Sequence, residues 1–135
     1  MKIVVGFKGT AEGKAALEWA IQEAGRRDAE IFLVHSLRGG SGPEAETEQV
    51  WAAREELEEV ERRLTDAGVS YSVRKYMRGK SPAEDLNDTV AKEGADMIVI
   101  GIRRRSRTGK LLLGSDAQEI LLEADCPVVA VKAQE

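Results

Sequence analysis

The fold is decided by residues 2–35, which read KIVVGFKGTAEGKAALEWAIQEAGRRDAEIFLVH. Both ends of this stretch, Lys2–Phe7 and Glu30–His35, are short runs rich in β-branched and aliphatic residues, a pattern that predicts strands. Between them, Ala11–Arg26 carries apolar residues at helical spacing. A strand, a helix and a second strand in this order predict two parallel strands joined by a right-handed crossover.

A long charged helix is expected next, at residues 46–67, after a Gly- and Ser-rich bridge at residues 37–43. Gly68 is placed to end this helix. The apolar residues of the helix recur at a spacing of three or four, which predicts one packed face and one solvated face. They are Val50, Ala53, Leu57, Val60 and Leu64.

The rest of the chain repeats the alternation. Strands are expected at residues 71–77, 97–100 and 128–131, and helices at residues 81–93 and 116–122. The runs 97–100 and 128–131 are continuously apolar, which is typical of strands covered on both faces or, for a terminal strand, buried against a partner. Five strands alternating with four helices predict an α/β fold with a doubly wound, open parallel sheet. We expect one domain over residues 1–135.

Composition excludes several classes of function. The formal net charge of -4 argues against general nucleic-acid binding, which needs a basic surface. No apolar run is long enough to span a bilayer, and the first residues lack a secretory pattern, so we expect a cytoplasmic protein without membrane contact. The single cysteine, Cys126, and the single histidine, His35, provide neither a disulfide nor a metal site.

Four other residues that carry reactive or aromatic groups are expected to pack in the core. Cys126 precedes a strand and is predicted to be a small apolar filler. His35 has no evident acidic or thiol partner in the sequence, which also favours packing. Trp19 and Trp51 fall on predicted helices, where packing is the expected role.

The segment GIRRRSRTGKLLLGS, residues 101–115, carries the main functional signal. It joins a buried strand to a helix, and such a glycine-containing crossing presents backbone N–H groups and the positive end of a helix to phosphate. Because ligands of doubly wound sheets bind beyond the carboxyl ends of strands, residues 6–10 and 101–115 are expected to meet at one crevice. Four arginines and a lysine crowd the loop: Arg103, Arg104, Arg105, Arg107 and Lys110.

Several segments, in their order and spacing, resemble the universal stress protein family over nearly the whole chain. They are the opening residues 2–20, IFLVHS, GKSPAEDL, ADMIVIG, the loop ending LLLGS and the closing DCPVVAVK. The resemblance implies a Rossmann-like sheet of strand order 3-2-1-4-5. It also implies a homodimer formed by pairing the last strands, here Val128–Val131, which would cover an otherwise exposed edge.

ATP-binding members of that family have a motif that is similar to residues 101–115: Gly, two residues, Gly, nine residues, Gly, then Ser or Thr. Gly101, Gly114 and Ser115 match it, whereas Arg104 stands at the second glycine. The resemblance implies that Gly101 lies by the ribose and phosphate. It implies that Gly114 and Ser115 offer N–H and hydroxyl groups to phosphate oxygens.

Three further positions resemble those that line the adenine and ribose pocket of the family. They are Gly6, Ser36 and Ile100, with Ser36 in place of a residue that is usually apolar. The ligand implied is ATP or another adenine nucleotide, with or without magnesium.

Two charges depart from the family pattern. Lys8 stands where an aspartate is usual, and an ammonium cannot accept a hydrogen bond from ribose hydroxyls. Asp116 follows Ser115 and either opposes a phosphate charge or caps its own helix. Arg103 and Lys8 are candidates for strengthening phosphate binding, because their positive charges can bind phosphate oxygens.

Three functions remain open at this level. The first is a cytoplasmic regulatory module that binds an adenine nucleotide. The second is a nucleotide-independent dimeric interaction protein, in which the crevice is vestigial and the arginines pair with acidic helix residues. The third is a slow ATPase, for which the sequence supplies no general base beside the loop.

Overall fold

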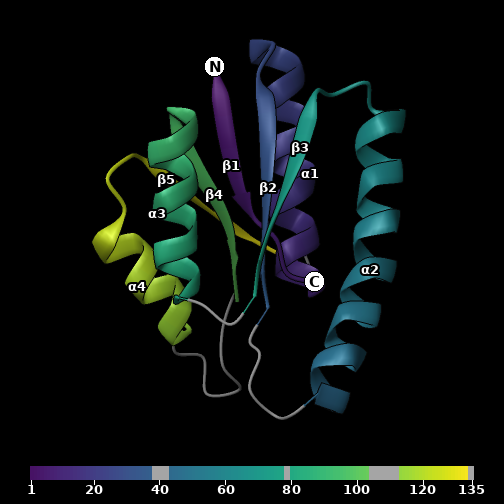
Figure 1. Cartoon of the computed structure of the whole chain (residues 1–135). Helices are drawn as coiled ribbons and strands as arrows, with labels where there is room; N and C mark the ends of the chain where they lie inside the picture. Colours follow the sequence, from purple (N-terminus) through teal and green to yellow (C-terminus); the bar gives the residue numbers. More distant parts are fainter. Residues whose placement is uncertain (38–42, 78–79, 104–112, 134–135) are drawn as a thin grey trace.

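The computed structural model describes residues 1–37, 43–77, 80–103 and 113–133, within which strands and helices alternate as the sequence predicts (Figure 1). The strands are β1 (Lys2–Gly6), β2 (Glu30–Leu37), β3 (Tyr71–Met77), β4 (Met97–Ile102) and β5 (Val128–Lys132). The helices are α1 (Ala11–Arg27), α2 (Pro43–Asp66), α3 (Pro82–Glu93) and α4 (Ser115–Glu123).

All five strands are parallel and lie in the order β3-β2-β1-β4-β5, which confirms the expected doubly wound sheet. From β1 the chain first extends the sheet through β2 to β3 and then returns to add β4 and β5 on the other side. The direction of winding therefore reverses between β1 and β4, where Val5 pairs with Val99. A crevice beyond the carboxyl ends of these two strands is the place where such sheets bind ligands.

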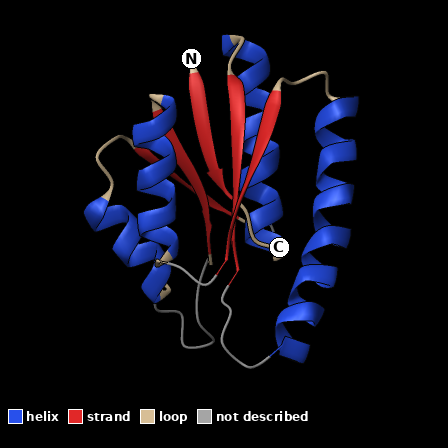
Figure 2. Cartoon of the chain, viewed as in Figure 1, coloured by secondary structure: helices blue, strands red, loops and turns tan. Residues whose placement is uncertain are grey.

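Helices cover both faces of the sheet, with α1 and α2 on one face and α3 and α4 on the other (Figure 2). Because successive strand residues point to opposite faces, β1 supplies both cores. Ile3 and Val5 pack on the side of α1 and α2, and Val4 packs on the side of α3 and α4. Burial on both faces explains why the central strands are continuously apolar.

Helices α1 and α3, which follow β1 and β3 and begin beside the crevice, are each capped by a side chain. At the start of α1, the Thr10 hydroxyl accepts a hydrogen bond from the Gly13 N–H at 3.1 Å. At the start of α3, Ser81 accepts one from the Glu84 N–H at 3.3 Å. Each cap satisfies an N–H group that has no partner within its helix, so these two helix ends are fixed by their own sequence.

Two glycines allow the first turn of α1 to lie directly against the sheet. A Cβ atom on Gly101, in β4, would collide with the backbone carbonyl of Glu12, and one on Gly13 would collide with the carbonyl of Lys8. The close approach draws the β1–α1 turn to the end of β4. The two segments expected to meet at the crevice are therefore in contact.

Helix α2 departs from the expectation in two respects. It begins at Pro43, inside the bridge expected at residues 37–43, and the first buried residue among its described side chains is Ala53. Val50 is 46% exposed and Trp51 is 60% exposed, so the prediction that they pack was wrong. A 24-residue helix is about 36 Å long, whereas an eight-residue strand spans about 26 Å, so the first turns of α2 extend beyond the sheet (Figure 1).

None of the described helices is both long enough and apolar enough to cross a membrane.

Candidate functional site

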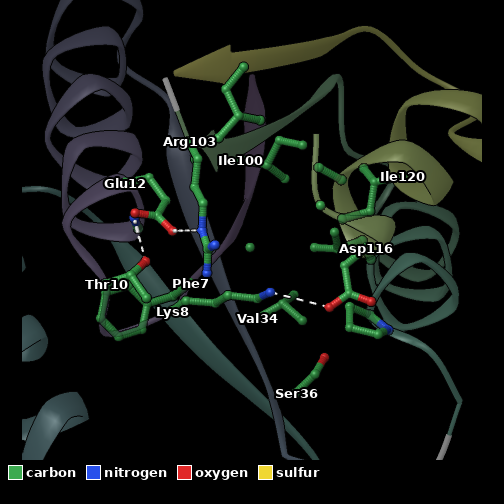
Figure 3. Close-up of a pocket in the computed structure, with 18 of the residues that line it drawn as sticks. Phe7, Lys8, Thr10, Glu12, Val34, Ser36, Ile100, Arg103, Asp116 and Ile120 are labelled. Carbon is green, nitrogen blue, oxygen red and sulfur yellow. Dashed lines mark hydrogen bonds and ion pairs between the residues drawn. The ribbon is translucent and has the colours of Figure 1, made fainter. Parts of the chain in front are cut away.

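A pocket of about 340 Å³ lies at the carboxyl ends of β1, β2 and β4 and is closed by the first turns of α1, α3 and α4 (Figure 3). Its volume is within the range of small-molecule sites. The residues singled out from the sequence all line it: Gly6, Ser36, Ile100, Gly101, Arg103, Gly114 and Ser115. The structure thus brings the predicted site residues together, while their contact with a ligand stays a prediction.

One wall of the pocket is the N-terminus of α4. Gly114 occupies the N-cap position, and no side chain among the described residues caps this helix, in contrast to α1 and α3. Among the described residues, nothing lies within 4 Å of a Cβ atom placed on Gly114, and its φ of -62° suits any residue, so within this part of the structure neither packing nor backbone conformation requires glycine. The first N–H groups of α4 have no partner within the helix and can bind an anion.

An ion pair crosses the pocket between its first and last segments. The Lys8 ammonium, from the β1–α1 turn, lies 3.2 Å from the Asp116 carboxylate in the first turn of α4 (Figure 3). Asp116 is the second residue of α4 and does not cap it, because the N-cap is Gly114. Exposed pairs of this kind stabilise a protein by about 0–1 kcal/mol, so a charged ligand can displace the contact.

A second, longer pair lies beside it. Arg103, just after β4, extends toward Glu12 of α1, with its Nε 3.8 Å from a carboxylate oxygen (Figure 3). Its side chain is 81% exposed and is therefore able to turn toward a phosphate. Arg104, Arg105, Arg107 and Lys110, which the sequence also offers to phosphate, lie outside the described residues.

Another part of the pocket lining is apolar. It is formed by side chains from β2, α3, β4 and α4, among them Val34, Leu86, Ile100 and Ile120. Gly6 lies at its base, where a Cβ atom would come within 3.4 Å of the side chains of Ile100 and Leu86. The pocket therefore combines a surface suited to a flat apolar group with a helix end suited to an anion.

The model of the Universal stress protein family matches residues 1–132. The chain belongs to the universal stress protein family. A universal stress protein from Mycolicibacterium smegmatis is 40% identical over 130 residues, an alignment that covers 96% of both chains. The resemblance that the sequence motifs indicated is thereby confirmed.

Solved structures of family members have the same fold. A universal stress protein from Archaeoglobus fulgidus superposes with a TM-score of 0.85 at 36% identity, and the match covers 98% of both chains. A universal stress protein from the same organism in complex with dAMP gives a TM-score of 0.77 at 31% identity, again over 98% of both chains. A family member with this sheet therefore binds an adenine nucleotide.

Ser36 differs from the apolar residues around it in this universal stress protein. Its hydroxyl donates a hydrogen bond to the Asp85 carboxylate, with 2.7 Å between the oxygens. Asp85 lies in the first turn of α3 and is 3% exposed, and this burial raises the pKa of its carboxyl. Asp85 was not predicted as a site residue, because its local sequence does not mark it as buried; the available signal was Ser36, a polar residue at a position that is usually apolar in the family.

His35 faces the other side of the sheet, away from the pocket. It is buried as expected, and its ring lies 6.0 Å from that of Phe7. The expectation that it lacks an acidic partner was wrong, since its Nε2 lies 3.8 Å from a carboxylate oxygen of Glu56, on α2. Burial nevertheless dominates and lowers the pKa of His35.

The other residues with metal-binding or redox side chains do not form a second site within the described part of the chain. Cys126 is half-buried against the core on the α3 and α4 side, and burial raises the pKa of its thiol. No cluster of three or more His, Cys, Asp or Glu side chains that could hold a metal occurs among the described residues.

Proposed function

We propose that this universal stress protein is a regulatory module that binds an adenine nucleotide, ATP or a relative of it, in the pocket described above. The observation that carries the proposal is the union, in one pocket, of an apolar wall and the uncapped N-terminus of α4. The adenine base fits the apolar wall, and a phosphate fits the N-terminus of α4. The dAMP complex of the Archaeoglobus relative, at 31% identity, supports the same class of ligand.

Charge decides how tightly the phosphates bind. Lys8 and Arg103 attract them, while the Asp116 carboxylate opposes them at the end of α4. We propose magnesium only as an ion that binds together with the phosphates of the ligand. The described residues contain no group of three or more His, Cys, Asp or Glu side chains that could hold a metal on their own. The location in the cytoplasm stays a prediction from the sequence.

The test is calorimetric titration of nucleotide-stripped protein with AMP, dAMP, ADP and ATP, with and without magnesium. We expect a dissociation constant below about 100 µM, equivalent to roughly 5.5 kcal/mol, for at least one of them. Absence of both heat and thermal stabilisation at millimolar nucleotide would leave the nucleotide-independent function.

Asp116→Asn sharpens this test. Removing the carboxylate should strengthen phosphate binding by about five-fold, a modest effect because the position is partly open to solvent. Asp125→Asn is the matched control, since Asp125 is exposed, makes the same change in net charge and does not line the pocket. Equal effects of the two substitutions would mean that phosphate does not bind at the end of α4.

A second candidate function is a nucleotide-independent dimer that acts through partner contacts. Two observations favour it: the Lys8–Asp116 pair crosses the pocket, and Leu122, on α4 just before the edge strand β5, is 85% exposed. We propose that β5, over Val128–Val131, pairs with the same strand of a second copy whichever of the two functions holds.

A further inference from the structure

Helix α2 carries two stripes of residues on opposite sides. The inner stripe consists of four buried residues, Ala53, Leu57, Val60 and Leu64. The outer stripe recurs at the same spacing of three or four residues, and all of its members are exposed: Glu44, Glu48, Trp51, Glu55 and Glu58. Residues at this spacing share one side of a helix, and the two stripes are half a turn apart, so the outer stripe faces away from the sheet. It begins in the turns of α2 that extend beyond the sheet (Figure 1).

Trp51, in the middle of the outer stripe, exposes a large apolar ring. Val50, next to it in the chain, is exposed as well. The guanidinium carbon of Arg54, one turn later, lies 5.7 Å from the centroid of the Trp51 ring, where a cation is attracted by the negative face of the ring. This contact shows which chemical group the ring accepts. Tryptophan is also among the residues that most often anchor protein interfaces.

The charge around Trp51 is strongly negative. Residues 44–61 contain eight glutamates and one arginine, a net charge of -7, whereas the whole chain carries -4. The helix dipole favours acidic groups only in the first turn, and Glu55 lies well beyond it. Among the residues that the structure describes, no lysine or arginine forms an ion pair with Glu44, Glu48 or Glu55. Glu44 and Glu48 are four residues apart and repel each other, so a basic partner would relieve a repulsion within α2.

The sign of this charge selects the kind of molecule that can cover the outer stripe. Nucleic acids and anionic membranes carry the same sign and are repelled. A second copy that met this stripe with its own would bring like charges together. A protein segment rich in lysine and arginine has the complementary charge, and its cations can bind both the glutamates and the face of Trp51.

We propose that the outer stripe is a docking surface for a basic, amphipathic helix of a partner protein. The stripe runs over 15 residues of α2, about 22 Å, which matches a partner helix of about four turns. Lysines and arginines of that helix pair with the glutamates, and an apolar side chain packs on Trp51. This surface does not include any residue that lines the pocket, so the inference is independent of nucleotide binding.

The experiment uses a defined probe, a peptide of about 18 residues that contains only lysine and leucine, with the leucines at a spacing of three or four. In a Trp19→Phe background Trp51 is the remaining tryptophan, and its fluorescence should shift to shorter wavelength when the peptide binds. Anisotropy of a labelled peptide then gives the affinity of each variant. Trp51→Ala should weaken binding by about ten-fold or more. Leu122→Ala is the matched control, since Leu122 is even more exposed and lies outside α2.

The charges are tested by the double substitution Glu48→Gln and Glu55→Gln. It should weaken binding by about five-fold at about 50 mM NaCl and by less at about 200 mM, because salt screens exposed charges. Glu123→Gln with Asp125→Asn is the control, because both residues are exposed, lie outside the outer stripe and give the same change in net charge. Circular dichroism shows that each variant is folded.

Several results would overturn the proposal. The wild type could fail to bind the peptide even at about 50 mM NaCl, or Trp51→Ala could behave like Leu122→Ala. Equal effects of the two double substitutions would mean that the peptide responds to net charge alone. Binding of a peptide with glutamate in place of lysine would mean that charge plays no part. Self-association that Trp51→Ala abolishes, seen by light scattering, would assign the stripe to a second copy instead.

Discussion

Gly101 and Gly114 belong to one motif, yet they have different physical tasks. Gly101 is required by packing, because a side chain there would collide with the backbone of Glu12. Gly114 has no described residue within 4 Å of its Cβ position and an ordinary φ, so no contact in the described part of the chain requires a glycine there. A motif matched in sequence therefore mixes a glycine that packing requires with one that the described contacts do not require.

Gly101→Ala should lower the free energy of unfolding by about 1–3 kcal/mol, the usual cost of forcing a group into a filled space. Gly25→Ala is the control: this exposed glycine lies inside α1 with nothing within 4 Å of its Cβ position, and the change should stabilise the protein by about 0.5–1 kcal/mol. Denaturant unfolding measures both. A neutral Gly101→Ala would show that α1 does not press on β4.

The sequence carries more information on some site residues than on others. Gly101, Gly114 and Ser115 could be identified because the motif is local, and the parallel topology then brings them to the residues that follow β1. Asp85 and Glu56 could not, because their roles depend on how α3 and α2 are rotated against the sheet. A carboxylate behind Ser36 and a carboxylate beside His35 are both contacts between elements distant in the sequence.

At the scale of elements, α2 is the clearest case of an incomplete prediction. Its helical spacing is regular from Val50 to Leu64, and the sequence alone cannot show where the sheet beneath it ends. Among the side chains of α2 that the structure describes, the fully buried ones begin at Ala53. Length mismatch between a long helix and short strands therefore sets the boundary, and no local pattern records it.

The contact between α2 and β2 should make stability depend on pH. His35 is enclosed by the Phe7 ring, by Glu56 of α2 and, further away, by the positive charge of Lys75 of β3, and burial holds its pKa below the ordinary value of 6.5. The unfolded chain therefore takes up a proton near pH 6.5 when the folded protein does not. Stability should be full above pH 6.5 and fall as the pH drops toward the lower pKa of the folded state.

His35→Gln, which cannot be protonated, should remove this part of the pH dependence. Urea unfolding at pH 7.5, 6.0 and 5.0 gives the measurement, and the difference between wild type and variant should shrink at the lower pH values. Asp85, whose pKa is raised, has the opposite sign and acts in both proteins, so it cancels in the comparison. A pH-independent difference would mean that His35 titrates normally in the fold.

For the whole molecule, the open edge of the sheet at β5 is the feature that bears on assembly. The Ile98 N–H donates to the Pro127 carbonyl at 2.9 Å, so Pro127 and Val129 turn their backbone groups toward β4. In a parallel pair, the residue between two such residues turns its N–H and carbonyl the other way. Ala130 therefore presents hydrogen-bonding groups to the free edge, where a second copy can pair.

Ala130→Pro should disrupt a dimer built on this edge, because proline removes the outward N–H without removing a bond to β4. Ala130→Ser retains the N–H and is the control. Sedimentation or light scattering of the wild type should give a dimer, and the proline variant should shift toward monomer while keeping its far-ultraviolet circular dichroism. A wild-type monomer, or a proline variant that stays dimeric, would exclude pairing through β5.

The ion pair between Lys8 and Asp116 joins the first turn of the chain to its last helix, 108 residues later. During synthesis on a ribosome, the sheet from β3 to β4 can assemble before α4 emerges, yet the wall of the pocket that α4 forms is missing until then. A ligand present at 100 times its dissociation constant raises the free energy of unfolding of the protein that binds it by about 2.7 kcal/mol. We expect a nucleotide bound in this pocket to give that gain only to a chain that already includes α4, so nucleotide supply should distinguish finished copies from unfinished ones by their resistance to proteolysis.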